Sequence, residues 1–126
     1  MMQMILAVTM GGAMGALGRF LVGKMMLRLM GPGFPWGTLT VNIVGSFFIG
    51  LLVVLLASRF NLSHHWQGFL ITGILGGFTT FSAFSLEVGL MLERHEITQA
   101  ALYAAGSIAF GVMALFLGLY AGRYLA

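Results

Sequence analysis

The sequence contains no cysteine, which excludes disulfide bonds and thiolate metal sites. Charged residues are nearly as scarce: they make up 7% of the 126 residues, whereas a soluble domain carries about a quarter. The six basic residues stand singly near the ends of apolar runs, which suits phospholipid headgroups and argues against a nucleic-acid partner. Together with a hydrophobic content of 60%, this composition predicts an integral membrane protein in contact with the lipid bilayer.

Proline is almost absent, and both prolines belong to a turn signal between the first two apolar runs. A membrane-spanning helix needs roughly 20 apolar residues. Four such runs are present, at about Met4–Met26, Thr38–Ala57, Trp66–Leu90 and Ile97–Tyr120. We therefore predict an all-α fold with a single domain of four transmembrane helices over residues 1–126, and with both termini on the same side of the membrane.

Four short helices enclose little interior, so a transport path through one copy is implausible and a two-fold dimer is expected. Small residues at four-residue spacing would allow the helices to approach closely. Basic residues outside the spans are nearly balanced, with Arg59 and Arg123 on one side and Lys24, Arg28 and Arg94 on the other. Because an excess of Lys and Arg normally sets the orientation, this balance predicts insertion both ways and an antiparallel homodimer.

The third run contains an interruption. Between Gly73 and Glu87 it holds three glycines, two adjacent threonines, three phenylalanines and two serines. We predict that the helix breaks over Gly76–Thr80, which frees backbone carbonyls at membrane depth. Such carbonyls can bind an alkali cation. A plain kink, with the carbonyls satisfied by threonine hydroxyls, is the equal alternative.

Asn42 is the polar side chain in the middle of the second run. Thr38 precedes it by one helical turn and Gly45 and Ser46 follow by one turn, so these residues share a face. The carboxamide can offer N–H donors to an anion, or it can form an ordinary hydrogen bond between helices. Both interpretations stay open from the residues alone.

Aromatic and hydroxyl side chains follow the predicted break. Phe81 and Phe84 share one face of the helix, and Ser82 and Ser85 form a parallel polar stripe. The edge of a phenyl ring is electropositive, so ring edges turned into a pore could stabilise a small anion. The alternative is that both rings only pack against other apolar groups.

Glu87 is the only acid expected within a span. An intramembrane acid can couple transport to protons or cations. Because Glu87 stands near a helix end, we expect it to reach the interface or to pair with Arg19. Arg19 itself, with Lys24 and Arg28 on the same helix, could attract anions or simply anchor the helix at the interface.

Three strings resemble one family of membrane proteins. They are GGAMGALGRF in the first run, PWGTLTVNIVGSFFIG at the start of the second, and GILGGFTTFSAFS followed by Glu87 in the third. Their order and spacing, and the total length, are similar to those of the Fluc/CrcB fluoride channels over nearly the whole chain. The resemblance implies an antiparallel dual-topology homodimer with two fluoride pores, which passively exports the toxic fluoride ion across the cell inner membrane and confers fluoride resistance.

The resemblance also implies roles for single residues. Asn42, Phe81 and Phe84 match pore-lining positions, and Ser82 lies beside the rings. The other matched positions are Thr38, Tyr103 and Ser107 in a polar track beside the pore, Arg19 near the vestibule, and the main-chain carbonyls of Gly76 and Thr79, which in both subunits hold a structural sodium ion that is not transported. Gly111 departs from the pattern, because some relatives carry a hydroxyl one turn beyond Ser107.

Two other functions compete with this interpretation. A small multidrug transporter also has four spans and forms a thin dimer, but its proton-coupled exchange needs an acid in the middle of the first helix, and this first run has none. A subunit whose glycine-rich helices only pack within a larger complex would leave the placement of Asn42, Phe81 and Phe84 unexplained. Nothing in the sequence has the spacing of a catalytic site, so no enzymatic activity is expected.

Overall fold

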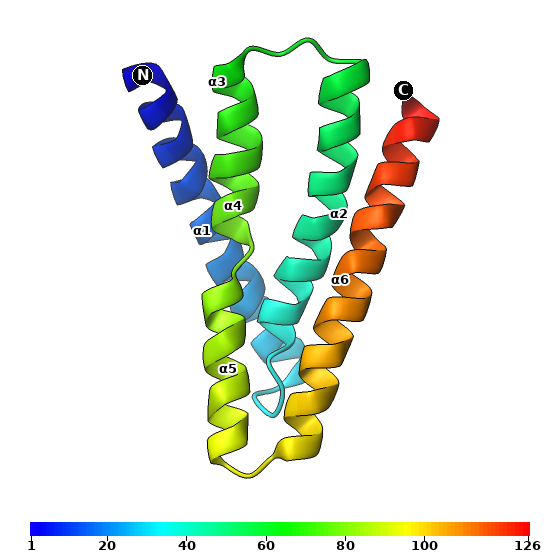
Figure 1. The fold of residues 1–126 in the computed structure, drawn as a ribbon. Coiled ribbons are helices and arrows are strands. Elements are labelled where there is room, and N and C mark those ends of the chain that lie inside the picture. Colours follow the sequence, from blue (N-terminus) through cyan, green and yellow to red (C-terminus); the bar gives the residue numbers. More distant parts are fainter.

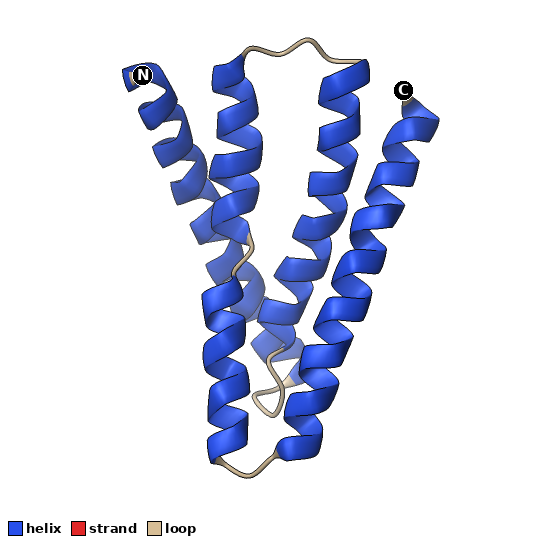
Figure 2. Ribbon diagram, viewed as in Figure 1, coloured by secondary structure: helices blue, strands red, loops and turns tan.

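The computed structural model describes all 126 residues as helices joined by short turns, with no strand (Figures 1 and 2). In chain order the elements are α1 (Met2–Met30), α2 (Trp36–Ser58), α3 (His64–Gln67), η1 (Gly68–Leu75), α4 (Gly76–Phe78), α5 (Phe81–Glu93) and α6 (Ile97–Leu125). The segments α3, η1, α4 and α5 follow one another along a single crossing.

Four helical segments are long and apolar enough to cross a membrane, as predicted. They are Met2–Met30, Trp36–Ser58, His64–Glu93 and Ile97–Leu125. Each extends a few residues beyond the predicted run, because helices continue to the next turn residue, such as Gly31 with its φ of 82°. Both termini lie at the end of the molecule that carries the α2–α3 loop (Figure 1).

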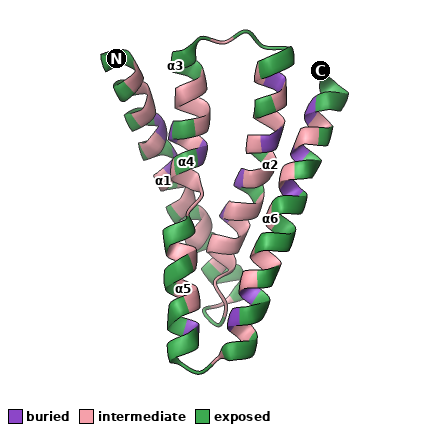
Figure 3. Ribbon diagram, in the orientation of Figure 1, coloured by how far each residue is buried: buried purple, intermediate pink, exposed green.

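The outer faces of the helices are apolar and uncovered. Only 14 of the 126 residues are buried within the chain, and the others are exposed or half-buried (Figure 3). Large hydrophobic side chains such as Phe116 and Leu102 are among the exposed ones. An apolar surface of this extent is unfavourable in water, whereas it is favourable in contact with the hydrocarbon core of a bilayer. The chain is a multi-pass membrane protein.

Two close helix pairs form the bundle. Helix α2 packs along α6, and α1 packs along η1 and α4. Glycine permits each contact: a Cβ on Gly118 of α6 would overlap the Phe47 carbonyl of α2, and a Cβ on Gly73 of η1 would lie 2.9 Å from the Gly11 Cα of α1. Lipid supplies little hydrophobic drive between helices, so close backbone approach stabilises both pairs.

The break in the third span is shorter than predicted. Thr79 (φ −88°, ψ 157°) and Thr80 (φ −155°, ψ 124°) are extended, and a new helix begins at Phe81. Gly76 and Gly77, which were expected to belong to the break, lie in a helical turn instead. Their small size serves packing, since a Cβ on Gly77 would lie 2.7 Å from the Gly12 carbonyl oxygen of α1. The β-branched threonines adopt the extended conformation that they favour.

The first part of the third span has a geometry that the sequence did not predict. Residues Gly68–Leu75 form a π-helix, which is rare and in most cases much shorter. Hydrophobic periodicity does not separate a π-helix from an α-helix over eight residues. This wider helix presents Gly73 to Gly11 and leads directly into the turn before the break.

The turn between α5 and α6 suggests a test of the fold. His95 has a φ of 62°, and it occupies the position where a helix normally ends in glycine. The amide of Glu96 donates to the Met91 carbonyl (2.9 Å) and the amide of His95 to the Leu92 carbonyl (3.0 Å), which is the Schellman pattern. We expect His95→Gly to increase stability by about 0.5–1 kcal/mol, because it removes the steric cost of a Cβ in this conformation.

The measurement is the midpoint of thermal unfolding in detergent, with His95→Ala as the control. Alanine keeps the Cβ and therefore gains nothing. A glycine variant that unfolds at a lower temperature than the alanine variant would contradict the assignment of strain to His95.

Candidate functional site

Asn42 holds the break in place through both ends of its carboxamide. Its Nδ2 donates to the Thr80 carbonyl at 3.0 Å, and its Oδ1 accepts from the Thr80 amide at 2.8 Å. The pair mimics one rung of a β-ladder and satisfies two backbone groups that the break would otherwise leave open. Of the two donor hydrogens that an amide carries, one remains free. Asn42 thus makes the interhelical hydrogen bond and also keeps a donor for a ligand.

The backbone carbonyls of Gly76 and Thr79 are among those that lose their helical partners at the break. In a continuous helix the Thr80 amide would donate to the Gly76 carbonyl, but here it donates to Asn42. The Ala83 amide would donate to the Thr79 carbonyl, but here it donates to the Thr80 hydroxyl at 3.1 Å, which caps α5. Gly76 and Thr79 are the two residues whose carbonyls the sequence resemblance assigned to sodium.

Threonine hydroxyls do not fill these two positions. The Thr79 hydroxyl donates at 2.9 Å to the Leu75 carbonyl, which also accepts the Thr79 amide at 3.0 Å. The Thr80 hydroxyl is shared between the cap of α5 and Ser82, whose Oγ lies 3.2 Å away. A plain kink satisfied by threonine hydroxyls therefore does not describe this segment.

Arg19 stabilises the turn before the break. Its Nε donates to the Gly77 carbonyl at 3.2 Å, and the side chain is half-buried. The expected pairing of Arg19 with Glu87 is wrong, because the two side chains bind different groups. The packing of α1 against α4 brings Arg19 to Gly77, whereas Glu87 lies on α5 beyond the break.

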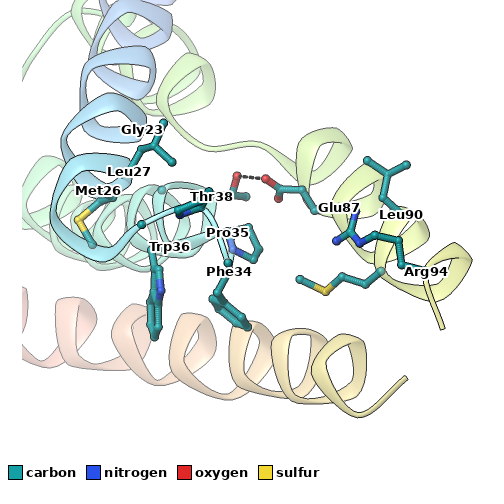
Figure 4. Close-up of a pocket in the computed structure, with 15 residues that line it drawn as sticks. Gly23, Met26, Leu27, Phe34, Pro35, Trp36, Thr38, Glu87, Leu90 and Arg94 are labelled. Carbon is teal, nitrogen blue, oxygen red and sulfur yellow. Dashed lines mark hydrogen bonds between the residues drawn. The ribbon is translucent and has the colours of Figure 1, made fainter. Parts of the chain in front are cut away.

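Glu87 is held by two neutral hydroxyls. The Thr38 hydroxyl donates to its Oε2 at 2.9 Å, and the Tyr103 hydroxyl donates to its Oε1 at 2.8 Å. Figure 4 shows the Glu87 carboxylate turned toward Thr38. These bonds link α2, α5 and α6 close to the α1–α2 turn, and the expected reach of Glu87 to the membrane interface stays a prediction. An acid in a span needs such partners, and this requirement was the available signal that Glu87 points inward.

A cavity of about 360 Å³, the turn cavity, lies between the α1–α2 turn and α5 (Figure 4). Its polar wall includes Thr38 and Glu87, with Arg94 at its edge. Arg94 forms the one ion pair of the chain, with Glu96 at 3.1 Å, and both side chains are substantially exposed. Such an exposed pair contributes little to stability.

A second hollow of about 310 Å³, the central groove, lies beside the break. It brings together side chains from α2, the break, α5 and α6. The residues that line it are Asn42, Ser46, Ile49, Thr79, Thr80, Phe81, Phe84, Ser107, Ile108 and Gly111. The predicted pore residues Asn42, Phe81, Phe84 and Ser107 therefore meet at one place, although their role toward an ion stays a prediction.

Thr38, Tyr103 and Ser82 lie outside the lining of the central groove. Thr38 and Tyr103 bind Glu87 one turn away from it, and Ser82 is exposed and contacts the Thr80 hydroxyl. Aromatic rings connect the two regions. The Phe84 ring lies 5.8 Å from that of Phe81 and 5.1 Å from that of Tyr103, between centroids.

Helices α2 and α6 run in the same direction (Figure 1) and pack against each other. A Cβ on Gly111 would lie 3.9 Å from Ser46 Oγ, and a Cβ on Gly50 would overlap the Leu115 carbonyl. In each of these pairs the residue on α6 has a number 65 higher than the residue on α2. The same offset, one and two turns earlier, pairs Asn42 with Ser107 and Thr38 with Tyr103.

Three successive turns of this helix pair are therefore polar, and a turn of four residues rises by about 6 Å. The Ser107 hydroxyl is buried in this row and has no hydrogen-bond partner. A buried hydroxyl without a partner is costly, so it marks a place where a ligand or a water is expected. Ser46, which shares the face of Asn42 on α2, belongs to the same row.

The arrangement suits the passage of a small ion rather than a reaction. The central groove offers neutral donors and ring edges, and no Asp, Glu, Lys, Arg or His lines it. The chain also contains no cluster of three His, Cys, Asp or Glu side chains that could hold a metal ion. The carbonyls of Gly76 and Thr79 are the groups that could bind a cation.

Comparison with known proteins places the chain in context. Residues 6–119 match the family model described as CrcB-like protein, Camphor Resistance (CrcB). A protein of Agrobacterium fabrum named Fluoride-specific ion channel FluC is 53% identical over 121 residues, which cover 96% of this chain and 97% of the relative.

Proteins with the same name in Allorhizobium ampelinum and Caulobacter vibrioides are also similar. The first is 48% identical over 98% of this chain and 99% of its own length. The second is 49% identical over 97% of each chain.

The double hydrogen bond of Asn42 can be tested directly. Asn42→Asp keeps an acceptor for the Thr80 amide but places a carboxylate oxygen opposite the Thr80 carbonyl. We expect a loss of about 2–4 kcal/mol, because the carbonyl loses its donor at membrane depth and faces a negative group. Thermal unfolding measures the loss, and amide hydrogen exchange at Thr80 and Ala83 should accelerate.

Gln67→Glu is the matched control, because the Gln67 amide donates to the Leu62 carbonyl (3.0 Å) beside the α2–α3 loop. Water can replace that donor, so the same chemical change should cost less than 1 kcal/mol. Equal losses at the two positions, with unchanged exchange at Thr80, would show that Asn42 does not hold the break.

Proposed function

This chain belongs to the CrcB family, and we propose that it is a fluoride-specific ion channel that lets fluoride cross the membrane passively. The observation that carries the proposal is the central groove beside a helix break, where neutral donors and ring edges converge. The named relatives add the identity of the ion, since each is called a fluoride-specific ion channel. Their name describes a channel, which favours this function over the small multidrug alternative.

The chemistry of the groove suits fluoride. This anion is small and strongly hydrated, so a channel must replace its water with hydrogen-bond donors. A fixed positive charge would hold the ion too tightly, because conduction needs binding that permits both entry and exit. The free N–H of Asn42, the unpartnered hydroxyl of Ser107 and the edges of Phe81 and Phe84 are donors of intermediate strength.

The functional unit that we propose is an antiparallel homodimer. Phe81 and Ile108 line the central groove, yet they are 78% and 65% exposed, so the chain leaves one side of the groove open. A second copy related by a two-fold axis would close both grooves and create two pores. The near balance of basic residues on the two sides supports insertion in both orientations.

A structural sodium ion fits the residues at the break. The carbonyls of Gly76 and Thr79 have lost their helical amide donors, and hard oxygen ligands suit an alkali cation. The same carbonyls from a second copy would complete the ligand set. When bound, sodium would supply positive charge to backbone oxygens that lipid leaves unsatisfied, and it would join the two copies without being transported.

The direction of transport follows from the chemistry of the ion. In acid surroundings fluoride enters a cell as neutral HF, which dissociates inside. A passive channel in the inner membrane would then release the accumulated anion and confer fluoride resistance. Tyr103, Thr38 and Glu87 would lie at one end of this path, and Arg19 beside the break.

Fluoride efflux from liposomes that contain only this protein tests the function. We expect the unmodified protein to release fluoride. Phe81→Ile and Phe84→Ile should each slow the release by about tenfold, because isoleucine retains apolar bulk but has no electropositive ring edge. Both variants should still form dimers, since the volume changes little.

If the two rings only pack, we expect the opposite result. Stability and efflux would then fall together, and Phe→Leu would change neither by much. Phe116→Ile, at an exposed position of α6 outside the groove, is the matched control and should leave efflux unchanged. Normal efflux from both groove variants would remove Phe81 and Phe84 from the proposed path. Failure of the unmodified protein to release fluoride would overturn the function itself.

Replacement of sodium by a large organic cation tests the ion and the dimer together. We expect dimer stability to fall, by about 2.7 kcal/mol if sodium was present at 100 times its Kd, and efflux to fall with it. Gly76→Ala should keep the sodium dependence, since its carbonyl remains and a Cβ there meets nothing closer than the Ile71 carbonyl oxygen at 3.6 Å. Full stability and efflux after exhaustive replacement would contradict the sodium site.

A further inference from the structure

The third polar turn of the α2–α6 pair is asymmetric. On the turn with Asn42 and Ser107, each helix contributes a polar side chain to the central groove. One turn further, α2 contributes the hydroxyl of Ser46, whereas α6 contributes Gly111, which has no side chain. The Ser46 hydroxyl faces this glycine, 3.9 Å from the place that a Cβ would take.

The position at Gly111 is open space rather than a close helix contact. A Cβ there would meet no heavy atom nearer than Ser46 Oγ. Gly50 and Gly118, on the same two helices, differ, because a Cβ at either would overlap the backbone of the other helix. Packing therefore requires glycine at positions 50 and 118 but not at 111, and a small ligand could occupy the gap.

The Ser107 hydroxyl behaves unlike that of an ordinary helical serine. The Ser58 hydroxyl donates to the Val54 carbonyl at 2.7 Å, which is the usual way to satisfy such a group inside a helix. The buried Ser107 hydroxyl makes no such bond and has no partner. With Ser46 it borders the gap at Gly111, so a ligand in the gap would have hydroxyl donors from both helices.

We propose that Ser46 is a further fluoride ligand, and that Ser46 and Ser107 form a second anion position in the gap beside Gly111. The inference rests on the proposed function and adds a residue that determines the rate of fluoride passage. An ion that leaves the free N–H of Asn42 would meet the Ser46 hydroxyl about 6 Å further along α2. The donor is neutral, so the ion can leave this position again.

The test measures fluoride efflux from liposomes for Ser46→Ala and for two double variants. Alanine favours helix formation, so Ser46→Ala retains α2, and we expect efflux to slow by about tenfold after the loss of one hydrogen bond to the anion. Adding Gly111→Ser supplies a hydroxyl from the other helix, and the rate should return to within about threefold of the original.

The double variant Ser46→Ala/Gly111→Ala is the matched control, because it fills the same space without a hydroxyl and should not recover. Dimer content and thermal unfolding should be alike in all variants. Normal efflux from Ser46→Ala would overturn the proposal, as would equal rates in the two double variants. An unmodified protein that releases no fluoride would instead overturn the proposed function, so the two failures are distinguishable.

Discussion

The structure depends on the pairing of the Asn42 carboxamide with the backbone of Thr80. A bilayer offers no water to a broken helix, so the open amide and carbonyl must find partners within the protein. Asn42 supplies both partners at 2.8 and 3.0 Å, and the Thr80 hydroxyl then caps α5. The Thr80 amide, bound to Asn42, and the Ala83 amide, bound to the Thr80 hydroxyl, are the donors that would have closed the helical ladder. They leave the carbonyls of Gly76 and Thr79 available.

This pairing also joins the two halves of the bundle. Helix α2 is packed against α6, and α1 is packed against η1 and α4. The two pairs meet where Asn42 binds Thr80 and where Gly45 faces the methyl group of Thr79. The break therefore lies at the junction of the pairs, and the central groove lies beside that junction. A shift of either pair along its axis would move the break away from its partner.

Charged groups near the proposed path are held by neutral partners and lie outside the central groove. Glu87 accepts from Thr38 and Tyr103, and Arg19 donates to the Gly77 carbonyl. The groove itself is lined by neutral side chains. Such a surface binds a small anion weakly enough for release, whereas a bare charge in the same place would bind or repel it strongly. The distribution of charge thus supports conduction rather than tight storage.

Several features followed from the residue pattern alone. Long apolar runs predicted the four helices, and Thr79–Thr80 stood within the predicted break, because lipid restricts spanning segments to helices and makes any interruption conspicuous. The common face of Phe81 and Phe84 also followed, since it depends on neighbours three residues apart.

The contacts between distant segments could not be predicted in this way. The partners of Glu87, the bond from Arg19 to Gly77, the π-helix and the facing of Ser46 and Gly111 all depend on the register between helices. That register is set by the close approach of glycines on both helices at once, which a single helix does not encode. For the same reason Gly76 and Gly77, which resemble breakers in the sequence, serve as packing surfaces in a helical turn, and the extended residues are the threonines.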